Sequence, residues 1–285
     1  MSALSRLRTR LRRLLQLADA TENPVVFTKY LRGRPPGTDL ALHYMPAPGV
    51  ERLPLPPPAL WLGYGESEAD YLDSGAKDVR VMTELLAGAG LDLMAPPAPV
   101  LELGCGGGRM LRHLLPATGS TEVWGLDISA PHIHWLRMHL SPPFHFAVNT
   151  TLPHLPFAEG YFSCVYCGSV FTHIDDFAEA WWLEIRRVLR PGGVLFCTLH
   201  DDDTRRLLQQ QPHYPLARNL RSHPSYLTAG ALLPDVLAIG EGNDSNVYYS
   251  NRWLHATLSR LFEIVRVVPG AYGYQSAWIL RKRPA

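Results

Sequence analysis

A glycine-rich segment at residues 100–110 is the first part of the chain whose residue types could do chemistry. A short apolar run containing Glu102 ends there in Gly104, Cys105 and Gly106. Glycines directly after a strand let the backbone turn tightly and approach a ligand at the start of the next helix. Glu102 places a carboxylate beside this turn, where it would repel a pyrophosphate and attract an ammonium group. The segment therefore favours a ligand with a positively charged group, although an ordinary tight turn would use similar residues.

Two common nucleotide-binding patterns do not match this segment. The dinucleotide fingerprint has Gly or Ala at its sixth position, where this chain has Arg109. A phosphate-binding P-loop needs Gly-Lys followed by Ser or Thr, and residues 100–110 contain no lysine. A dehydrogenase is therefore disfavoured.

An acidic residue ends the next apolar run. Asp127 follows Val123–Leu126, and a carboxylate roughly 20 residues after a glycine turn of this kind accepts hydrogen bonds from ribose hydroxyls. The alternative role is to cap the following helix, which Ser129 could do equally well. Given the glycine turn upstream, we expect Asp127 to bind a ribose.

Two more segments complete the pattern. Residues 155–162 lead through an apolar run to Gly168, Ser169 and His173. At residues 185–195 a helical pattern ends, Pro-Gly-Gly turns the chain, and a further apolar run begins.

These four segments, in this order and spacing, resemble the class I S-adenosylmethionine-dependent methyltransferases of the type 11 and type 25 kind. The resemblance covers about residues 98–200 and the final strand pair. It implies an enzyme that uses S-adenosyl-L-methionine as its cofactor. It also implies an α/β fold with a Rossmann-like, doubly wound, seven-stranded sheet in the order 3-2-1-4-5-7-6, in which strand 7 is antiparallel.

The resemblance also implies roles for individual residues in cofactor binding. Glu102 would approach the amino group of the cofactor, Asp127 would hold the ribose and Ile128 would lie on the adenine. Loop residues Gly104, Cys105 and Gly106 would flank the methionine part, and Gly168 with Ser169 would border the cofactor after the fourth strand. Many relatives carry an Asp near the end of the third strand, whereas this chain has Asn149. An amide oxygen can accept the same hydrogen bond from the adenine amino group, so Asn149 is the candidate there.

Two histidines are the candidate catalytic residues. His173 lies just past the fourth strand and His200 just past the fifth, so in this fold both side chains would face the site. A general base is needed only if the acceptor must lose a proton, as a hydroxyl does. A structural role is the alternative for each histidine. No metal site is expected, because Cys164 and Cys167 would face opposite sides of a strand.

The elements that position these residues alternate between strands and helices. Apolar runs predict strands near residues 100–103, 122–126, 144–148, 162–167 and 194–199, with helices over 133–140 and 176–189 and another following Met110. This alternation predicts a mainly parallel sheet with helices on both faces. Strands at 262–268 and 276–280 are joined by so short a turn that they must pair antiparallel.

The N-terminal third has a different pattern of residues. Residues 3–18 predict a basic amphipathic helix, residues 35–58 a proline-rich connector and residues 67–88 a further helix. We expect residues 1–95 to form an N-terminal helical extension with a lid. Residues 96–285 would then form the methyltransferase domain, with an insertion at 204–247.

Composition narrows the class of protein. The chain has 285 residues, 46% hydrophobic and 19% charged, with a net charge of +1 and four cysteines. These values favour a cytoplasmic globular protein without a transmembrane segment, a disulfide scaffold or strong nucleic-acid binding. A homodimer is one expected assembly.

We therefore expect methyl transfer to an oxygen or nitrogen of a small polar acceptor, such as a sugar or a secondary metabolite. One alternative is an RNA or protein methyltransferase that uses the basic N-terminal arm. Another is a non-catalytic partner that only binds the cofactor.

Overall fold

The computed structural model describes residues 53–211, 213–223, 234–240 and 245–284. The basic helix expected over residues 3–18 and most of the proline-rich connector at 35–58 lie outside these ranges. The boundary expected at residue 95 stays a prediction.

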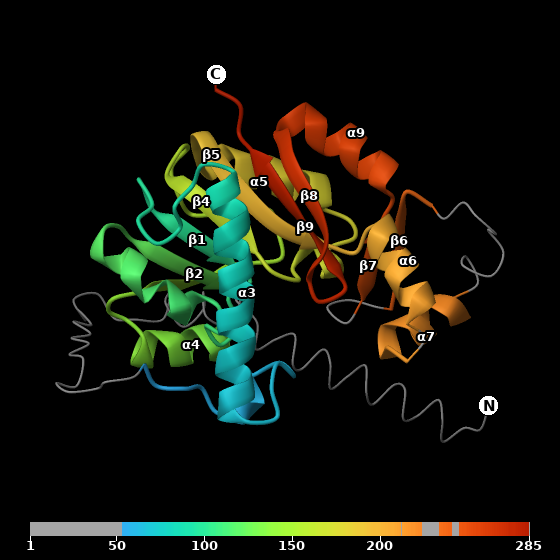
Figure 1. Cartoon of the computed structure of the whole chain (residues 1–285). Coiled ribbons are helices and arrows are strands. Elements are labelled where there is room, and N and C mark those ends of the chain that lie inside the picture. The colour runs from blue at the N-terminus through green and yellow to red at the C-terminus, as the bar shows by residue number, and fades with distance from the viewer. Residues whose placement is uncertain (1–52, 212, 224–233, 241–244, 285) are drawn as a thin grey trace, which may run out of the picture.

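A seven-stranded sheet occupies the centre of the described chain (Figure 1). Its spatial order is β3-β2-β1-β4-β5-β9-β8, which confirms the expected order 3-2-1-4-5-7-6. The first five strands are parallel, and β9 is antiparallel to both of its neighbours. The strands are β1 (Val100–Leu103), β2 (Val123–Asp127), β3 (His145–Val148), β4 (Phe162–Cys167), β5 (Leu189–Leu199), β8 (Glu263–Tyr272) and β9 (Gln275–Arg281).

Two strands are longer than the sequence pattern predicts. Strand β5 begins at Leu189 and includes Pro191, because the pairing with β4 shifts register between Phe162 and Cys164 and so accommodates the Pro-Gly-Gly residues. Strand β8 likewise continues through Pro269 to Tyr272, with a register shift before Tyr272. An edge strand tolerates proline, because the missing N–H faces away from the sheet.

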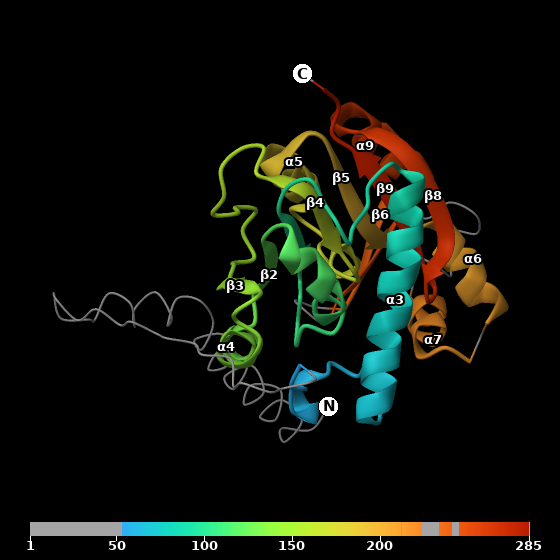
Figure 2. The same cartoon turned by 60° about the vertical axis from the view of Figure 1, so that its left-hand side comes forward.

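Helices cover the sheet and connect its strands (Figures 1 and 2). Leu111–Gly119 (η2) is a 3-10 segment rather than the expected α-helix, because Pro116 lies inside it and Leu114 has non-helical torsion angles. None of the helices in the described ranges is long and apolar enough to cross a membrane. The others are η1 (Pro58–Leu60), α3 (Glu68–Gly88), α4 (Ala130–His139), η3 (Phe171–His173), α5 (Ala178–Val188), α6 (Asp202–Gln210), α7 (Pro215–Ser222) and α9 (Asn251–Leu261).

The two faces of the sheet carry separate hydrophobic cores. Helices α3 and α4 and segment η2 pack on one face, where Met82 and Leu136 are fully buried. Helices α5 and α9 pack on the other, where Trp182 and Leu254 are fully buried. Cys164 and Cys167 contribute to opposite cores, which agrees with the alternation of side chains along a strand.

The insertion between β5 and α9 forms a small unit of its own beside the sheet. It contains α6, α7 and an antiparallel hairpin of β6 (Val236–Ile239) and β7 (Asn246–Tyr249). Leu208, Leu220, Leu237 and Tyr248 are the large members of its hydrophobic cluster. A bridge between His200 and Tyr248 joins this unit to the end of β5.

Helix α6 begins at a buried carboxylate. Asp201 is fully buried and accepts hydrogen bonds from the backbone N–H groups of Asp203 and Thr204, as an N-cap does. It also accepts bonds from Ser276 Oγ and Trp278 Nε1 on β9. The same side chain therefore starts the helix and attaches it to the sheet.

We expect Asp201→Ala to lower the free energy of unfolding by about 3 kcal/mol, because four donors lose their acceptor and two of them come from buried side chains. Chemical denaturation measures this change. Asp92→Ala is the control, since Asp92 is exposed and accepts one backbone bond, from Met94. Equal losses for the two variants would contradict this account of Asp201.

Candidate functional site

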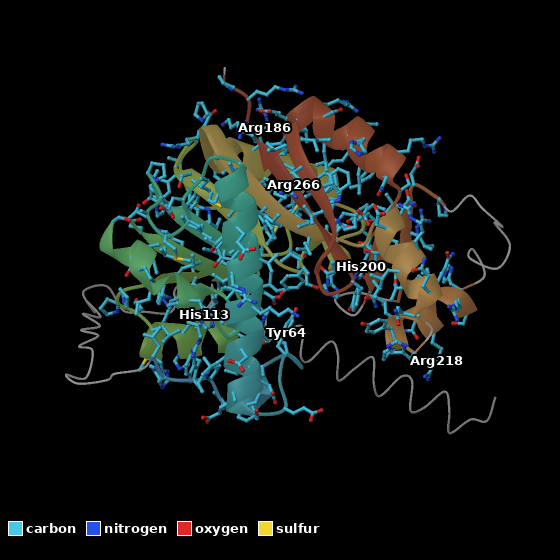
Figure 3. All side chains as sticks on the ribbon, in the orientation of Figure 1. Tyr64, His113, Arg186, His200, Arg218 and Arg266 are labelled. Atoms are coloured by element: carbon cyan, nitrogen blue, oxygen red, sulfur yellow. The ribbon has the colours of Figure 1, made fainter. Side chains whose placement is uncertain are left out.

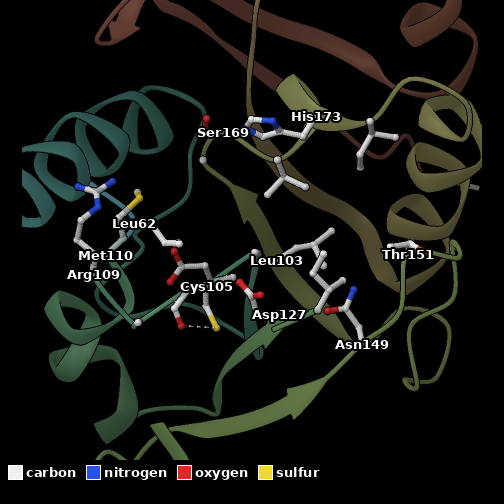
Figure 4. A pocket seen from close by; sticks show the side chains of 18 of the residues that line it. Leu62, Leu103, Cys105, Arg109, Met110, Asp127, Asn149, Thr151, Ser169 and His173 are labelled. Carbon is white, nitrogen blue, oxygen red and sulfur yellow. Dashed lines mark hydrogen bonds between the residues drawn. The ribbon is translucent and has the colours of Figure 1, made fainter. Parts of the chain in front are cut away.

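A cavity of about 730 Å³ lies at the carboxyl ends of β1, β2 and β4 (Figure 4). Parallel strands place their carboxyl ends at one edge of the sheet, and open α/β sheets bind ligands at that edge. Ten of the eleven residues that the sequence singles out line this cavity. They are Glu102, Gly104, Cys105, Gly106, Asp127, Ile128, Asn149, Gly168, Ser169 and His173.

The glycine loop after β1 turns tightly around the end of β2. The N–H groups of Gly104 and Cys105 both donate to the carbonyl of Leu126, at 2.7 and 3.0 Å. Gly104 and Gly106 have positive φ angles of 77° and 48°, which glycine adopts without strain. A side chain at Gly104 would also collide with Val170, whose Cγ2 lies 2.4 Å from the Cβ position. This loop therefore needs glycine for its conformation and for its close approach to Val170.

Asp127 ties the end of β2 to this loop. Its Oδ2 accepts a hydrogen bond from the N–H of Gly106 at 2.7 Å, and its Oδ1 accepts one from the N–H of Ser129 at 2.8 Å. The side chain thus points into the loop and lies at the wall of the cavity. Each carboxylate oxygen can accept more than one bond, so both retain capacity toward a ligand.

Glu102 is a nearly buried carboxyl in the cavity wall. It is 4% exposed, and its Oε2 accepts a hydrogen bond from Tyr166 at 2.9 Å. Burial raises the pKa of Glu102 to about 8, although the bond from Tyr166 and the charge of Arg109 act in the opposite direction. A positively charged group beside Glu102 would favour its ionised form.

Asn149 presents an unpartnered oxygen to the same cavity. Its side chain donates through Nδ2 to the carbonyl of Thr150 at 3.1 Å, while Oδ1 is buried and has no partner in the described part of the chain. An amide oxygen in this position can accept a bond from a ligand amino group. Ile128 lines the same cavity.

The turn after β4 supplies the wall opposite Asn149. Figure 4 draws Ser169 and His173 at one end of the cavity and Asn149 and Thr151 toward the other. Imidazole Nδ1 of His173 lies 2.7 Å from the carbonyl oxygen of Ser245. Because a carbonyl only accepts, Nδ1 carries the proton, and Nε2 of the neutral ring is left as an acceptor.

His200 lies apart from this wall. It is 1% exposed, does not line the cavity, and stacks on Tyr248 in the insertion (Figure 3). Neither of its ring nitrogens has a hydrogen-bond partner among the described residues, and burial lowers its pKa to about 3. The structure therefore does not bring His200 together with the other candidate residues.

Arg109 is a cavity residue whose contacts the sequence did not indicate. Its Nη1 forms an ion pair with Asp78 of α3 at 2.7 Å, and its Nη2 donates to the hydroxyl of Tyr272 on β8. The guanidinium also lies 4.0 Å above the ring centre of Tyr64. Arg109 therefore joins the glycine loop to the helical extension and to the terminal hairpin. The signal in the sequence was an arginine at a position where other glycine loops need a small residue.

The segment that precedes α3 covers the glycine loop. Leu60 lies over Gly107, and the ring of Trp61 stacks on Tyr71. Imidazole Nε2 of His132 lies 3.2 Å from the carbonyl of Leu60 and fastens this segment to α4. The chain from 53 to 67 thus forms a lid over one side of the cavity.

We expect Gly107→Ala to displace the lid. An added Cβ would lie 2.9 Å from the carbonyl oxygen of Leu60 and 3.0 Å from the hydroxyl of Tyr71. The expected cost is about 1–3 kcal/mol of stability, together with faster proteolysis within residues 53–67. Gly88→Ala is the matched control, because its Cβ position is open and alanine favours a helix. Similar cleavage rates for the two variants would count against a packed lid.

Comparison with known proteins agrees with this geometry. Residues 101–197 match the family model described as "Methyltransferase domain". The chain is 28% identical over 203 residues to the 2-methyl-6-phytyl-1,4-hydroquinone methyltransferase of Synechocystis, an alignment that covers 68% of this chain and 62% of that protein. It is 28% identical over 102 residues to a malonyl-[acyl-carrier protein] O-methyltransferase of Hahella chejuensis, which covers 36% of each. The chain thus spans less than two thirds of the length of these curated relatives.

Solved structures share the fold at low sequence identity. An S-adenosylmethionine-dependent methyltransferase from Clostridium acetobutylicum superposes with a TM-score of 0.51 at 14% identity, covering 73% of this chain and 92% of that one. A protein of Pyrococcus horikoshii also superposes with a TM-score of 0.51, at 20% identity and with 77% and 100% coverage. On its motifs, its sheet order and the matched family model, the chain contains a class I S-adenosylmethionine-dependent methyltransferase domain.

Proposed function

We propose that this protein transfers a methyl group from S-adenosyl-L-methionine to an oxygen or nitrogen of a small polar acceptor. The observation that carries the proposal is the single cavity that Glu102, Asp127 and Asn149 share with the glycine loop. The two curated relatives are named for a hydroquinone and for a malonyl carrier protein. Their names support methyl transfer, and they differ in the acceptor. A sugar or a secondary metabolite remains our proposal for this chain.

The residues of the cavity fit the cofactor at its polar ends. Asn149 Oδ1 is buried, has no partner within the ranges that the structure describes, and suits the adenine amino group. Asp127 retains acceptor capacity for the ribose hydroxyls. At the other end, Glu102 is a buried carboxyl without an ion-pair partner among the described residues, and it suits the cofactor's amino group.

The backbone of the site fits the middle of the cofactor. Within the loop of Gly104, Cys105 and Gly106, the two glycines leave space where a side chain would meet Val170 or Leu62. We assign the flank of the methionine part to this loop and the adenine face to Ile128. Gly168 and Ser169 would border the cofactor from the end of β4.

In the proposed reaction the chain holds the acceptor, excludes water and takes up a proton. Bound S-adenosyl-L-methionine supplies a methyl group on a positively charged sulfur, which is already activated for displacement. The cavity walls hold the acceptor in line with that methyl group and exclude water, which lowers the entropic part of the barrier. His173 takes the acceptor's proton on Nε2, because Ser245 holds the proton of the ring on Nδ1.

His173 suits this role better than His200. His173 lines the cavity and presents one acceptor nitrogen, whereas His200 is buried behind the wall among tyrosine rings. The low pKa of His200 also makes it a weak base.

Calorimetry with S-adenosylhomocysteine tests the proposed cofactor. We expect wild-type protein to bind it and Asp127→Ala to bind about 10²-fold more weakly, because two hydrogen bonds to the ribose are lost. Asp73→Ala, which removes an exposed carboxylate from α3, is the control and should bind as wild type does. Absence of binding by the wild-type protein would end the proposal. Thermal melting of each variant shows whether a loss of binding reflects unfolding.

Cofactor affinity should rise with pH because of Glu102. The raised pKa, about 8, means that much of Glu102 is protonated at pH 6 in the free protein, whereas the bound ammonium group favours the carboxylate. Binding therefore releases a proton below pH 8. Affinity should increase by up to about tenfold per pH unit between pH 6 and 8 and then level off. Calorimetry in buffers of different ionisation enthalpy measures the proton release.

Glu102→Gln is the matched variant for the pH experiment, since it keeps the size of the side chain and cannot ionise. It should bind more weakly at pH 8 and show little dependence on pH. The same slope in the variant as in wild type would assign the titration to another group.

A further inference from the structure

Two residues of the cavity wall have strained backbones. Leu62 and Ser169 have φ angles of 55° and 59°, and within the described ranges they are the non-glycine residues with positive φ. Both line the cavity. Such a conformation costs about 1 kcal/mol and persists where surrounding contacts hold it, often at ligand sites.

Buried side chains hold Ser169 in this conformation. The backbone N–H of Ser169 donates to Thr198 Oγ1 at 2.7 Å, and Thr198 Oγ1 donates to Gln275 Oε1 at 2.6 Å. Gln275 Nε2 then donates to Ser169 Oγ at 2.9 Å. The hydrogen bonds form a closed ring through β5 and β9, which fixes both the backbone and the hydroxyl of Ser169.

The direction of these bonds is also fixed. Thr198 is fully buried, so its hydroxyl proton needs a partner, and Gln275 Oε1 is the acceptor it reaches. The amide of Gln275 must therefore turn its NH₂ group to Ser169. Ser169 Oγ accepts that bond and keeps its own proton to donate.

The proton of Ser169 makes a long hydrogen bond within the wall. Ser169 Oγ and Thr172 Oγ1 are 3.1 Å apart, and because Thr172 donates its own proton to the carbonyl of Ser169, Ser169 is the donor in this bond. A ligand oxygen in the cavity could replace Thr172 as the acceptor of this proton. The wall after β4 therefore offers one donor, Ser169 Oγ, and one acceptor, His173 Nε2, at the same end of the cavity (Figure 4).

We propose that this donor and acceptor select a hydroxyl group, so that the protein is an O-methyltransferase in which Ser169 binds the acceptor oxygen. This inference rests on the proposed function and narrows it. A hydroxyl oxygen has two lone pairs, so it can accept a bond from Ser169 and still attack the methyl carbon. A neutral amine has one lone pair, and a bond from Ser169 would occupy it.

The proposed reaction is a displacement at the methyl carbon in which the acceptor hydroxyl loses its proton. The acceptor oxygen forms a bond to the methyl carbon as the bond from that carbon to sulfur breaks, and the electron pair of the broken bond stays on sulfur. The hydroxyl proton passes to His173 Nε2 and from there to water. Ser169 stabilises the negative charge that develops on oxygen as the proton leaves. A neutral amine develops no such charge, and it gains nothing from this donor.

Matched pairs of acceptors test the proposal. Para-nitrophenol and para-nitroaniline, phenol and aniline, and cyclohexanol and cyclohexylamine each share a skeleton and differ in the reacting group. We expect labelled methyl transfer to favour the hydroxyl member. Calorimetry on the complex with S-adenosylhomocysteine ranks the members of any pair that binds without turnover. The absorbance of para-nitrophenol in that complex should also shift toward the phenolate form, and this shift should be lost in His173→Gln.

Ser169→Ala should lower kcat/KM for hydroxyl acceptors by about 10²-fold, the effect of losing one donor to a developing oxyanion. The ratio of hydroxyl to amine methylation should fall with it. Ser169→Gly removes the same donor and also relieves the strain of the positive φ. We expect it to lower the ratio as much as Ser169→Ala does, but to melt at a higher temperature. This difference separates an effect on the chemistry from an effect on folding. Thr151→Ala removes a hydroxyl from the other end of the cavity and should leave the ratio unchanged.

Several outcomes would overturn the proposal. One is that the protein methylates or binds the amine members in preference to the hydroxyl members. Another is that Ser169→Ala lowers kcat/KM equally for both members of a pair. A third is that no pair shows any difference between its hydroxyl and amine members. Failure to bind S-adenosylhomocysteine would instead reject the proposed function itself. A protein that binds S-adenosylhomocysteine and shows no preference for hydroxyls would reject only the role of Ser169.

Discussion

The hydrogen bond from the Gly106 N–H to Asp127 Oδ2 is the contact on which the arrangement of the site depends. It joins the loop after β1 to the end of β2, which the parallel register already places side by side through Leu103 and Leu126. The loop can approach Asp127 because its glycines take positive φ angles and leave space beside Val170. The positions of Glu102 at the end of β1 and Asn149 after β3 follow from the same register. The shared placement of these polar groups at one cavity thus results from strand order and one tight turn.

Contacts from distant parts of the chain close this cavity. Arg109 binds Asp78 of α3 and Tyr272 of β8, so a residue of the loop holds both the helical extension and the terminal hairpin in place. The lid before α3 lies on Gly107, and His132 reaches its backbone from α4. Elements that are far apart in the sequence therefore support the same cavity wall.

Much of the fold and part of the site follow from the sequence. Apolar runs that end in glycine or acidic residues predict the five parallel strands. They also predict the edge of the sheet at which Asp127 and His173 both lie. Pro116 was a visible signal against an α-helix after the loop, but the periodic leucines around it pointed to one. The sequence analysis assigned residues 204–247 to an insertion without predicting the hairpin of β6 and β7 in it. The partners of Arg109 and the ring of bonds around Ser169 were not predictable. They depend on side chains that are far apart in the sequence, and no local pattern records which of them will meet.

The contact between His173 and the Ser245 carbonyl has a consequence for how this domain could change. The group that sets the ring tautomer belongs to the main chain, so exchanging the serine for another residue would leave it in place. Lengthening or shortening the segment around β7 would move this carbonyl. Variation in the length of the insertion would therefore change the tautomer of His173 without any replacement of the histidine itself.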